Sequence, residues 1–191
     1  MDTIKFHLKG VSPSLMQSDR LANPLDPLKK EMAKITGKRK KTDEDHEEMA
    51  RIEFVAGIYC DPKVGPFWPG QNIEAMFRDA AKMTRRGTDV KRVLMVLDDK
   101  VPLIYEGPRT VKELYADPER FVDMRTVVVQ RARTMRCRPI FREWEVKFEV
   151  GFEAATFNRE EVVAIAKEAG RKIGLSSYRP RFGRFEVVSA E

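Results

Sequence analysis

Two stretches of the chain alternate between apolar and polar residues, which is the pattern of a strand with one buried face. In the first, Ile4, Phe6 and Leu8 each follow a polar residue. In the second, which begins at Trp144, apolar side chains alternate with charged ones as far as Glu149. Two shorter runs rich in apolar and β-branched residues add to these. The sequence therefore predicts four strands, at residues 4–8, 93–97, 144–152 and 185–187.

Apolar residues at helical spacing predict two helices between these strands. One begins at Pro69-Gly70 and ends at Gly87, and the other begins at the N-cap Asn158 and closes at residues 170–174. The resulting order of strands and helices is typical of a split βαβ domain of the α+β class, ferredoxin-like or RRM-like. We expect such a domain to leave one sheet face free of helices, and a face of this kind is a common RNA platform.

Two large insertions, at about residues 12–70 and 98–142, interrupt this core. In the first we expect turns, a short helix at 28–35, and a second helix that begins at a capping box formed by Thr42 and Asp45. We interpret residues 1–191 as a single RRM-like domain that carries both insertions.

The composition favours a polyanionic partner. The chain has 36 Lys and Arg against 30 Asp and Glu, a net charge of +6 and a pI near 9.3, and a surface of this kind attracts nucleic acid. With 42% hydrophobic residues, the chain also has enough apolar side chains to form a core.

No metal, cofactor or catalytic group stands out in the sequence. Cys60 and Cys137 have no metal-ligand spacing, and neither His7 nor His46 has a Ser, Cys or second His at a catalytic spacing. There is no phosphate-binding P-loop and no dinucleotide fingerprint. No apolar run approaches the ~20 residues of a membrane span, and we see no signal peptide. We therefore expect a soluble cytoplasmic protein without a cofactor, and favour a protein that is not an enzyme.

Arginine is concentrated just before the longest predicted strand. On an extended backbone Arg131 and Arg133 share one face. Arg136 and Arg138 share the other, so a turn or bulge near Thr134, as in a hairpin, is needed to gather all four. Guanidinium groups suit phosphate oxygens and stack on unpaired bases; the alternative is a solvated strand that pairs with nearby glutamates. The candidate residues are Arg125, Arg131, Arg133, Arg136, Arg138 and Arg142.

A second candidate segment connects the last helix to the last strand. Its glycines allow close approach of a backbone, its aromatic rings offer stacking surfaces and its arginines offer phosphate contacts. The alternative is a capping glycine, a turn proline and a core aromatic residue. A third candidate is a basic run in the first insertion, although such runs are usually only solvated. These residues are Tyr178, Arg179, Arg181, Phe182 and Arg184 in the connection, and Lys38, Arg39, Lys40 and Lys41 in the run.

Two stretches resemble the RAMP superfamily, the RNA-binding backbone and processing proteins of CRISPR effector complexes. Residues 57–78, with Phe67-Trp68-Pro69-Gly70-Gln71-Asn72, resemble the entry into the family's first core helix. Residues 174–185 are similar to its glycine-rich loop before the last strand. Gln71-Asn72 replaces the usual pair of small hydroxyl residues, the final loop has fewer glycines than is typical, and the chain is short for a backbone subunit. These departures favour a divergent relative, such as one encoded by a phage or other mobile element.

The resemblance implies a ferredoxin-like fold that binds single-stranded RNA along an oligomer, with residues 125–142 in place of a thumb-like hairpin. It also implies that Asp26 matches the target-cleaving aspartate of some backbone subunits. Three hypotheses follow. The first is a non-catalytic protein that binds single-stranded RNA or DNA and assembles along it, as a homo-oligomer or larger nucleoprotein complex. The second is a RAMP-type endoribonuclease that uses His7 or His46, and the third is a phage structural or interaction protein whose basic surface binds an acidic partner.

Overall fold

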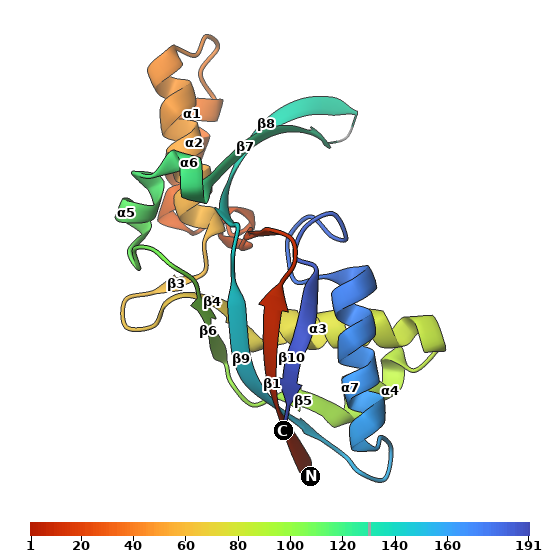
Figure 1. Ribbon diagram of the computed structural model, residues 1–191. Helices are drawn as coiled ribbons and strands as arrows, with labels where there is room; N and C mark the ends of the chain where they lie inside the picture. Colours follow the sequence, from red (N-terminus) through yellow and green to blue (C-terminus); the bar gives the residue numbers. More distant parts are fainter. Residues whose placement is uncertain (130) are drawn as a thin grey trace.

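The computed structural model describes residues 1–129 and 131–191 and shows an antiparallel sheet covered by helices on one face (Figure 1). Four strands of the core lie in the order β10-β1-β9-β5, and every neighbouring pair is antiparallel. Together with two helices they give the split βαβ topology, so the prediction of an α+β, ferredoxin-like fold is confirmed. The core elements are β1 (Asp2–Gly10), α3 (Gly70–Ala81), β5 (Leu94–Val96), β9 (Glu145–Phe152), α7 (Arg159–Glu168) and β10 (Phe185–Ala190).

The alternating residues of the two long strands form the centre of the core. Phe6 on β1 lies opposite Phe148 on β9, and their ring centroids are 5.7 Å apart. Phe77 of α3 meets the ring of Phe6 edge-on at 5.7 Å. All three side chains are buried, so the sheet and its first helix are held together by the positions that the alternation predicted. Aromatic pairs of this geometry add about 0.5–1.5 kcal/mol beyond the burial of their area.

The helix boundaries agree with the predicted caps at one helix and differ at the other. α7 begins with a capping box between Asn158 and Glu161, as expected from the N-cap residue. α3, however, ends at Ala81, and Gly87 begins a separate short helix, α4 (Gly87–Val93). The prediction that Gly87 ends the first core helix is wrong, because the chain turns earlier, at the left-handed residue Arg85 (φ 61°).

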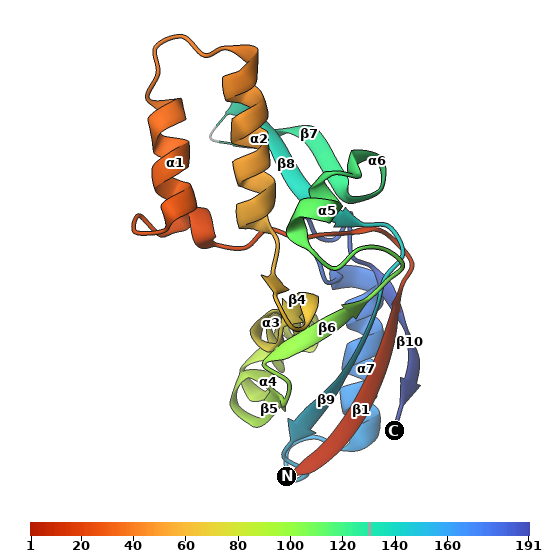
Figure 2. The same cartoon turned by 90° about the vertical axis from the view of Figure 1, so that its left-hand side faces the viewer.

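The first insertion forms a helical hairpin that stands apart from the sheet (Figure 2). The Thr42–Asp45 capping box is confirmed at the start of its second helix. Two short strands, which the sequence did not predict, follow this hairpin. The elements are β2 (Ser14–Leu15), α1 (Pro27–Thr36), α2 (Asp43–Gly57), β3 (Cys60–Asp61) and β4 (Gly65–Pro69).

The second insertion carries a long β-hairpin that arches over one end of the sheet, opposite the two termini (Figure 1). Its strands pair without a register shift from Val122↔Pro139 to Val129↔Ala132. The turn therefore lies at Arg131 (φ 69°), and no turn or bulge occurs at Thr134. The elements are β6 (Lys100–Ile104), α5 (Val111–Tyr115), α6 (Pro118–Phe121), β7 (Val122–Val129) and β8 (Ala132–Phe141).

Candidate nucleic-acid interface

The connection between α7 and β10, residues 174–184, forms a closed loop at the end of the sheet beneath the hairpin; we call it the C-terminal loop. Gly174 (φ 85°) and Gly183 (φ 76°) both adopt left-handed backbone conformations at its ends. A Cβ atom on Gly183 would lie 2.3 Å from the carbonyl oxygen of Leu175. The N–H of Leu175 donates to the carbonyl of Gly183 at 2.7 Å, which closes the loop. Only glycine combines this backbone conformation with so close an approach.

The short strand β2 attaches the C-terminal loop to the hairpin. On one edge, Leu15 pairs with Ile140 of β8. On the other, the N–H of Leu15 donates to Oγ of Ser176 at 3.0 Å, and Oγ of Ser14 donates to the carbonyl of Leu175 at 2.6 Å. The buried side chains of Leu15 and Ile140 also pack with Phe182. Loop and hairpin, about forty residues apart in sequence, therefore form one continuous structure.

A polar pocket of about 660 Å³ lies where the C-terminal loop meets the beginning of α3. The start of α3 contributes Gln71 and Asn72, and the loop contributes Ser177 and Arg179. These residues come from the two stretches in which the sequence resembles the RAMP superfamily, and the fold brings both stretches to one pocket. Residues 17–19, from the first insertion, also line it, and no motif in the sequence indicated their role.

Three flat groups stack from the C-terminal loop to the hairpin. The rings of Tyr178 and Phe182 lie 5.8 Å apart, and the Arg125 guanidinium lies 4.6 Å from the centre of the Phe182 ring. Phe182 is only 7% exposed, whereas Tyr178 is 47% exposed. The expectation that both aromatics offer stacking surfaces therefore needs correction: Phe182 packs in the interior, and the open ring is that of Tyr178.

Arginines near the base of the hairpin are either paired with carboxylates of the protein itself or buried. Arg125 donates to the buried side chain of Asp123, with Nε 2.7 Å from Oδ2, and this hydrogen bond raises the pKa of the arginine. Arg138 lies opposite Asp123 in the ladder and is only 8% exposed, so burial lowers its pKa. Arg136 forms an ion pair with Glu53 of α2, whose other oxygen accepts from the N–H of Cys137 at 2.9 Å. Their ion pairs, and the burial of Arg138, leave these three arginines less accessible to a ligand.

The exposed arginines of the hairpin lie toward its tip. Arg131 and Arg133 are both exposed, and the unbroken ladder places Arg133 on the face opposite Arg136. The expected gathering of the arginines on one surface is therefore wrong, because it required a break at Thr134 that the hairpin does not have. At the far end of β8, Arg142 is exposed and donates to the carbonyl of Glu119.

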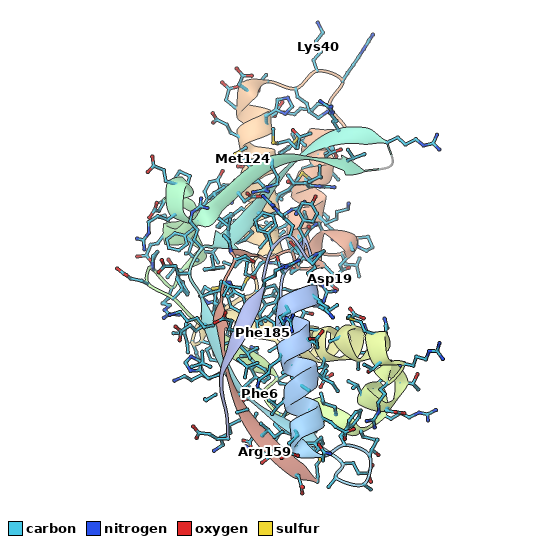
Figure 3. The ribbon with its side chains drawn as sticks, turned by 45° about the vertical axis from the view of Figure 1, so that its right-hand side comes forward. Phe6, Asp19, Lys40, Met124, Arg159 and Phe185 are labelled. Carbon is cyan, nitrogen blue, oxygen red and sulfur yellow. The ribbon has the colours of Figure 1, made fainter. Side chains whose placement is uncertain are left out.

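The remaining basic candidates differ in whether they form ion pairs or hydrogen bonds with other residues of the protein. In the C-terminal loop, Arg179 forms an ion pair with Asp79 of α3 at 3.3 Å, and Arg184 donates to the carbonyl of Pro180. Arg181 is exposed, and no ion pair is seen for it within the described part of the chain. The basic run lies between α1 and α2, away from the loop, and Lys40 projects from this end of the molecule (Figure 3).

Two members of that run have structural contacts. Lys38 forms an ion pair with Asp45 at 2.6 Å, so the capping carboxylate of α2 also holds this lysine. Nζ of Lys41 donates to the carbonyl of Lys38. Arg39 and Lys40 are exposed.

The open face of the sheet carries balanced charges. Across the β1–β9 ladder, Lys5 lies opposite Glu149 and Lys9 lies opposite Glu145. His7 lies on the same face and is 2.7 Å from a carboxylate oxygen of Glu145, which helps to hold the pKa of Glu145 below its usual value. Among the polar positions of β1 and β9 the only ring is the His7 imidazole, which Glu145 engages. These positions thus lack the Phe, Tyr and Trp rings on which RNA platforms stack bases.

The histidines and Asp26, the candidates for a cleaving group, lie outside the polar pocket, whose lining includes the carboxylate of Asp19. Neither His7 nor His46 lines the polar pocket between α3 and the C-terminal loop. His46, on α2, lines a separate groove beside the hairpin. Asp26 is the N-cap of α1, where it accepts from the N–H of Leu28 and forms an ion pair with Arg20 at 2.9 Å. In the described residues, no group of three or more His, Cys, Asp and Glu could hold a metal ion, and no helix is long and apolar enough to cross a membrane.

Comparison with known proteins finds similarity in structure but not in sequence. No family model and no curated protein matches the sequence. Among solved structures, the chain is similar to one in a cryo-EM structure of the Type III-B Cmr-beta bound to cognate target RNA, with a TM-score of 0.54 and 10% sequence identity. The match covers 99% of this chain and 59% of the neighbour. It supports a RAMP-like fold.

Proposed function

We propose that this protein binds single-stranded RNA in the polar pocket between α3 and the C-terminal loop, with the strand continuing past the tip of the hairpin. One observation carries the proposal. The two stretches that resemble the RAMP superfamily, residues 57–78 and 174–185, meet at one pocket, beside which Tyr178 and Arg181 are exposed. An open aromatic ring next to unengaged arginine is the combination that stacks a base and holds its phosphate.

The groups at the pocket suit different parts of a nucleotide. Arg181 on the loop, with Arg131 and Arg133 at the hairpin tip, offers guanidinium groups to phosphate oxygens. Tyr178 offers a ring for one base, a contact that tolerates any sequence. Gln71, an exposed residue at the start of α3, can hydrogen-bond a base edge or a 2′-hydroxyl.

RNA is favoured over single-stranded DNA because the structural neighbour belongs to an assembly described with target RNA. The same likeness supports membership in a larger nucleoprotein complex.

A groove of about 800 Å³ between the α1–α2 hairpin and the β7–β8 hairpin supports assembly with further copies of the chain along the strand. Met124 and Met135 are exposed on the hairpin and line this groove, which gives it an apolar surface.

Binding without cleavage fits the placement of the two histidines. A general acid or base must lie within hydrogen-bond reach of the strand; both histidines lie outside the proposed pocket, whose lining includes one carboxylate, that of Asp19. The alternative is the RAMP-type endoribonuclease with His7 or His46 as general acid or base. Asp26, which the resemblance matches to a target-cleaving aspartate, is held by Arg20 and the N-terminus of α1.

The experiment is a titration of fluorescently labelled single-stranded RNA and DNA of ~30 nucleotides at two salt concentrations, with gel analysis of the strands afterwards. We expect RNA to bind more tightly, with a steep loss of affinity at the higher salt and intact strands, because several phosphate contacts release counterions. Failure of the protein to bind either strand at low salt would overturn the proposal and favour an interaction protein with an acidic partner. Cleavage that Asp26→Asn abolishes would establish the nuclease instead.

A further inference from the structure

A second basic surface lies where α3 ends and α4 begins, and none of its lining residues was singled out for binding by the sequence. A pocket of about 430 Å³ at this corner is lined by four cationic side chains, one hydroxyl and one glycine, with no carboxylate among them. We call it the α3–α4 corner. Its lining residues are Arg78, Lys82, Arg85, Gly87, Thr88 and Lys91.

Close packing of two helix ends concentrates these charges. Arg78 and Lys82 are four residues apart and therefore lie on one side of the chain as α3 ends. Gly87 lies directly against them: a Cβ atom there would be 2.7 Å from Cγ of Lys82 and 3.2 Å from the carbonyl oxygen of Arg78. The glycine thus lets the start of α4, with Thr88 and Lys91, approach the end of α3.

The backbone at the corner holds an arginine where glycine would be more stable. Arg85 ends the short helical turn after α3 with φ at 61°, in the left-handed region that disfavours residues with a side chain. Its side chain is exposed, and no ion pair of Arg85 is found among the described residues. The backbone of Arg85 is therefore strained, and its guanidinium forms no ion pair with the described residues. This combination favours a role for the guanidinium in binding a ligand.

The nearby carboxylates are already occupied. Asp79 accepts from Lys82 at 2.8 Å and lies 3.3 Å from Arg179. Although burial opposes its ionisation, the hydrogen bond from Lys82 and the neighbouring arginines hold the pKa of Asp79 below its usual value. Asp89 pairs with Arg86 at 3.3 Å. Neither carboxylate neutralises Arg85 or Lys91 in the described structure.

The corner adjoins the proposed RNA pocket. Arg179 belongs to the C-terminal loop, lines the polar pocket and contacts Asp79, one residue after Arg78. The carboxylate of Asp79 therefore connects Arg179 of the loop with the corner, since it also lies 3.6 Å from Nε of Arg78. Figure 1 shows this corner on the same side of the sheet as α7, distant from α5 and β3.

We propose that the α3–α4 corner binds a backbone phosphate of the single strand after it passes Arg179, which extends the binding site by at least one nucleotide step. This inference rests on the proposed function. Arg85 and Lys91 supply the unengaged charges, Arg78 and Lys82 reinforce them, and the Thr88 hydroxyl is placed to donate to a phosphate oxygen. The corner offers no aromatic ring, so its contact is independent of sequence.

The test compares the unmodified protein with a variant that lacks the two unengaged charges, Arg85→Gly with Lys91→Gln. Both proteins are titrated with two RNAs. On the ~30-nucleotide RNA we expect affinity to fall about tenfold and the salt slope to decrease by about 0.7 for each phosphate that the variant no longer neutralises. On a ~6-nucleotide RNA, short enough to occupy only the pocket, we expect no change. Arg85→Gly should leave the thermal midpoint equal or higher, because glycine tolerates the left-handed conformation.

The matched control removes two exposed lysines from the opposite side of the molecule, Lys63→Gln with Lys112→Gln. We expect this control to bind both RNAs as the unmodified protein does. Equal affinity of the corner variant and the unmodified protein for the long RNA would overturn the inference and leave the proposed function standing. Failure of the unmodified protein to bind either RNA would instead overturn the proposed function. Equal losses in the corner variant and the control would show a general effect of charge and would contradict a site at the corner.

Discussion

The base of the β7–β8 hairpin and the C-terminal loop are both rich in arginine, yet their arginines have different roles. At the hairpin base Arg125, Arg136 and Arg138 lie against Asp123 and Glu53 and are partly or fully buried. In the loop, Arg181 is exposed and no carboxylate pairs with it in the described structure. A high local density of arginine therefore does not show by itself which arginines can bind a ligand. That depends on whether each guanidinium group is exposed and whether a carboxylate already pairs with it.

Charge balance separates the open sheet face from the loop in the same way. On the sheet, lysines of β1 lie opposite glutamates of β9, so a strand of RNA would meet alternating signs. At the loop end, Arg181 is exposed, Arg179 pairs with Asp79 of α3, and four cationic side chains line the α3–α4 corner beyond that carboxylate. The net charge of +6 does not distinguish these surfaces; the distribution of its charges does.

Removal of the buried carboxylate at the hairpin base should have the largest effect on stability. Asp123→Ala removes the carboxylate that accepts from Arg125 and the acidic charge nearest to Arg138, which is 8% exposed and whose Nε has no hydrogen-bond partner among the described residues. We expect the free energy of unfolding to fall by about 3 kcal/mol, because the buried guanidinium of Arg138 then loses the charge that compensates it. Chemical denaturation measures this loss. A loss below ~0.5 kcal/mol would mean that the base is held mainly by other contacts.

The next largest effect is expected at the loop closure. Gly183→Ala places a methyl group against the carbonyl of Leu175 in a left-handed backbone, and we expect a destabilisation of roughly 2 kcal/mol. Because the same loop forms the pocket, RNA affinity should fall as well. Gly37→Ala is the matched control, since Gly37 has a right-handed backbone at the end of α1. Similar thermal midpoints for both variants would contradict the strained closure.

Tyr178→Ala should affect binding without affecting stability. Its ring is 47% exposed, and loss of a base-stacking ring costs about 1–3 kcal/mol of binding, or about tenfold in affinity. Phe182→Ala should show the reverse pattern, with a loss of stability of about 3 kcal/mol, because the ring is buried among Leu15 and Ile140. If Tyr178→Ala unfolds the protein as readily as Phe182→Ala does, the ring belongs to the core and not to the interface.

The smallest effect concerns Cys137 at the hairpin base. Burial, and then the charge of Glu53, raise the pKa of this thiol from 9.0 to about 12. Its contribution to stability is therefore complete below pH 9 and is lost as the pH rises from 9 toward 12. At pH 8 we expect alkylation to modify the partly exposed Cys60 before Cys137. Mass spectrometry of the alkylated protein measures both rates, and Asp123→Ala should accelerate modification of Cys137.

The strands and caps were predictable because local residues determine them. Alternation along residues 4–8 and 144–152, and the capping boxes at Thr42 and Asn158, depend on nearest neighbours in the chain. The end of α3 was not predictable from local residues, because an arginine with left-handed backbone stands where a glycine usually marks such a turn. No local pattern could show that Glu53 would reach Arg136, eighty-three residues away.

The candidate site was predictable in part. The C-terminal loop was found from its interleaved glycines, aromatics and arginines, but burial of Phe182 depends on β2, a strand of two residues that pairs across more than a hundred positions. The sequence did not indicate the α3–α4 corner, because its cationic residues are spread from 78 to 91 and come together only when α4 packs on α3. Arg78 and Lys82, four residues apart on one helical side, were the local signal of it.

The most direct measurement is the affinity of a ~30-nucleotide RNA for two variants that each lose two positive charges. Arg133→Gln with Arg181→Gln removes exposed charges from the hairpin tip and the C-terminal loop, and Lys5→Gln with Lys147→Gln removes them from the open sheet face. We predict that the first variant loses affinity at least about tenfold with a reduced salt slope, while the second binds as the unmodified protein does. Equal losses in the two variants would contradict the proposed interface, because binding would then follow net charge and not the surface formed by the loop and the hairpin tip.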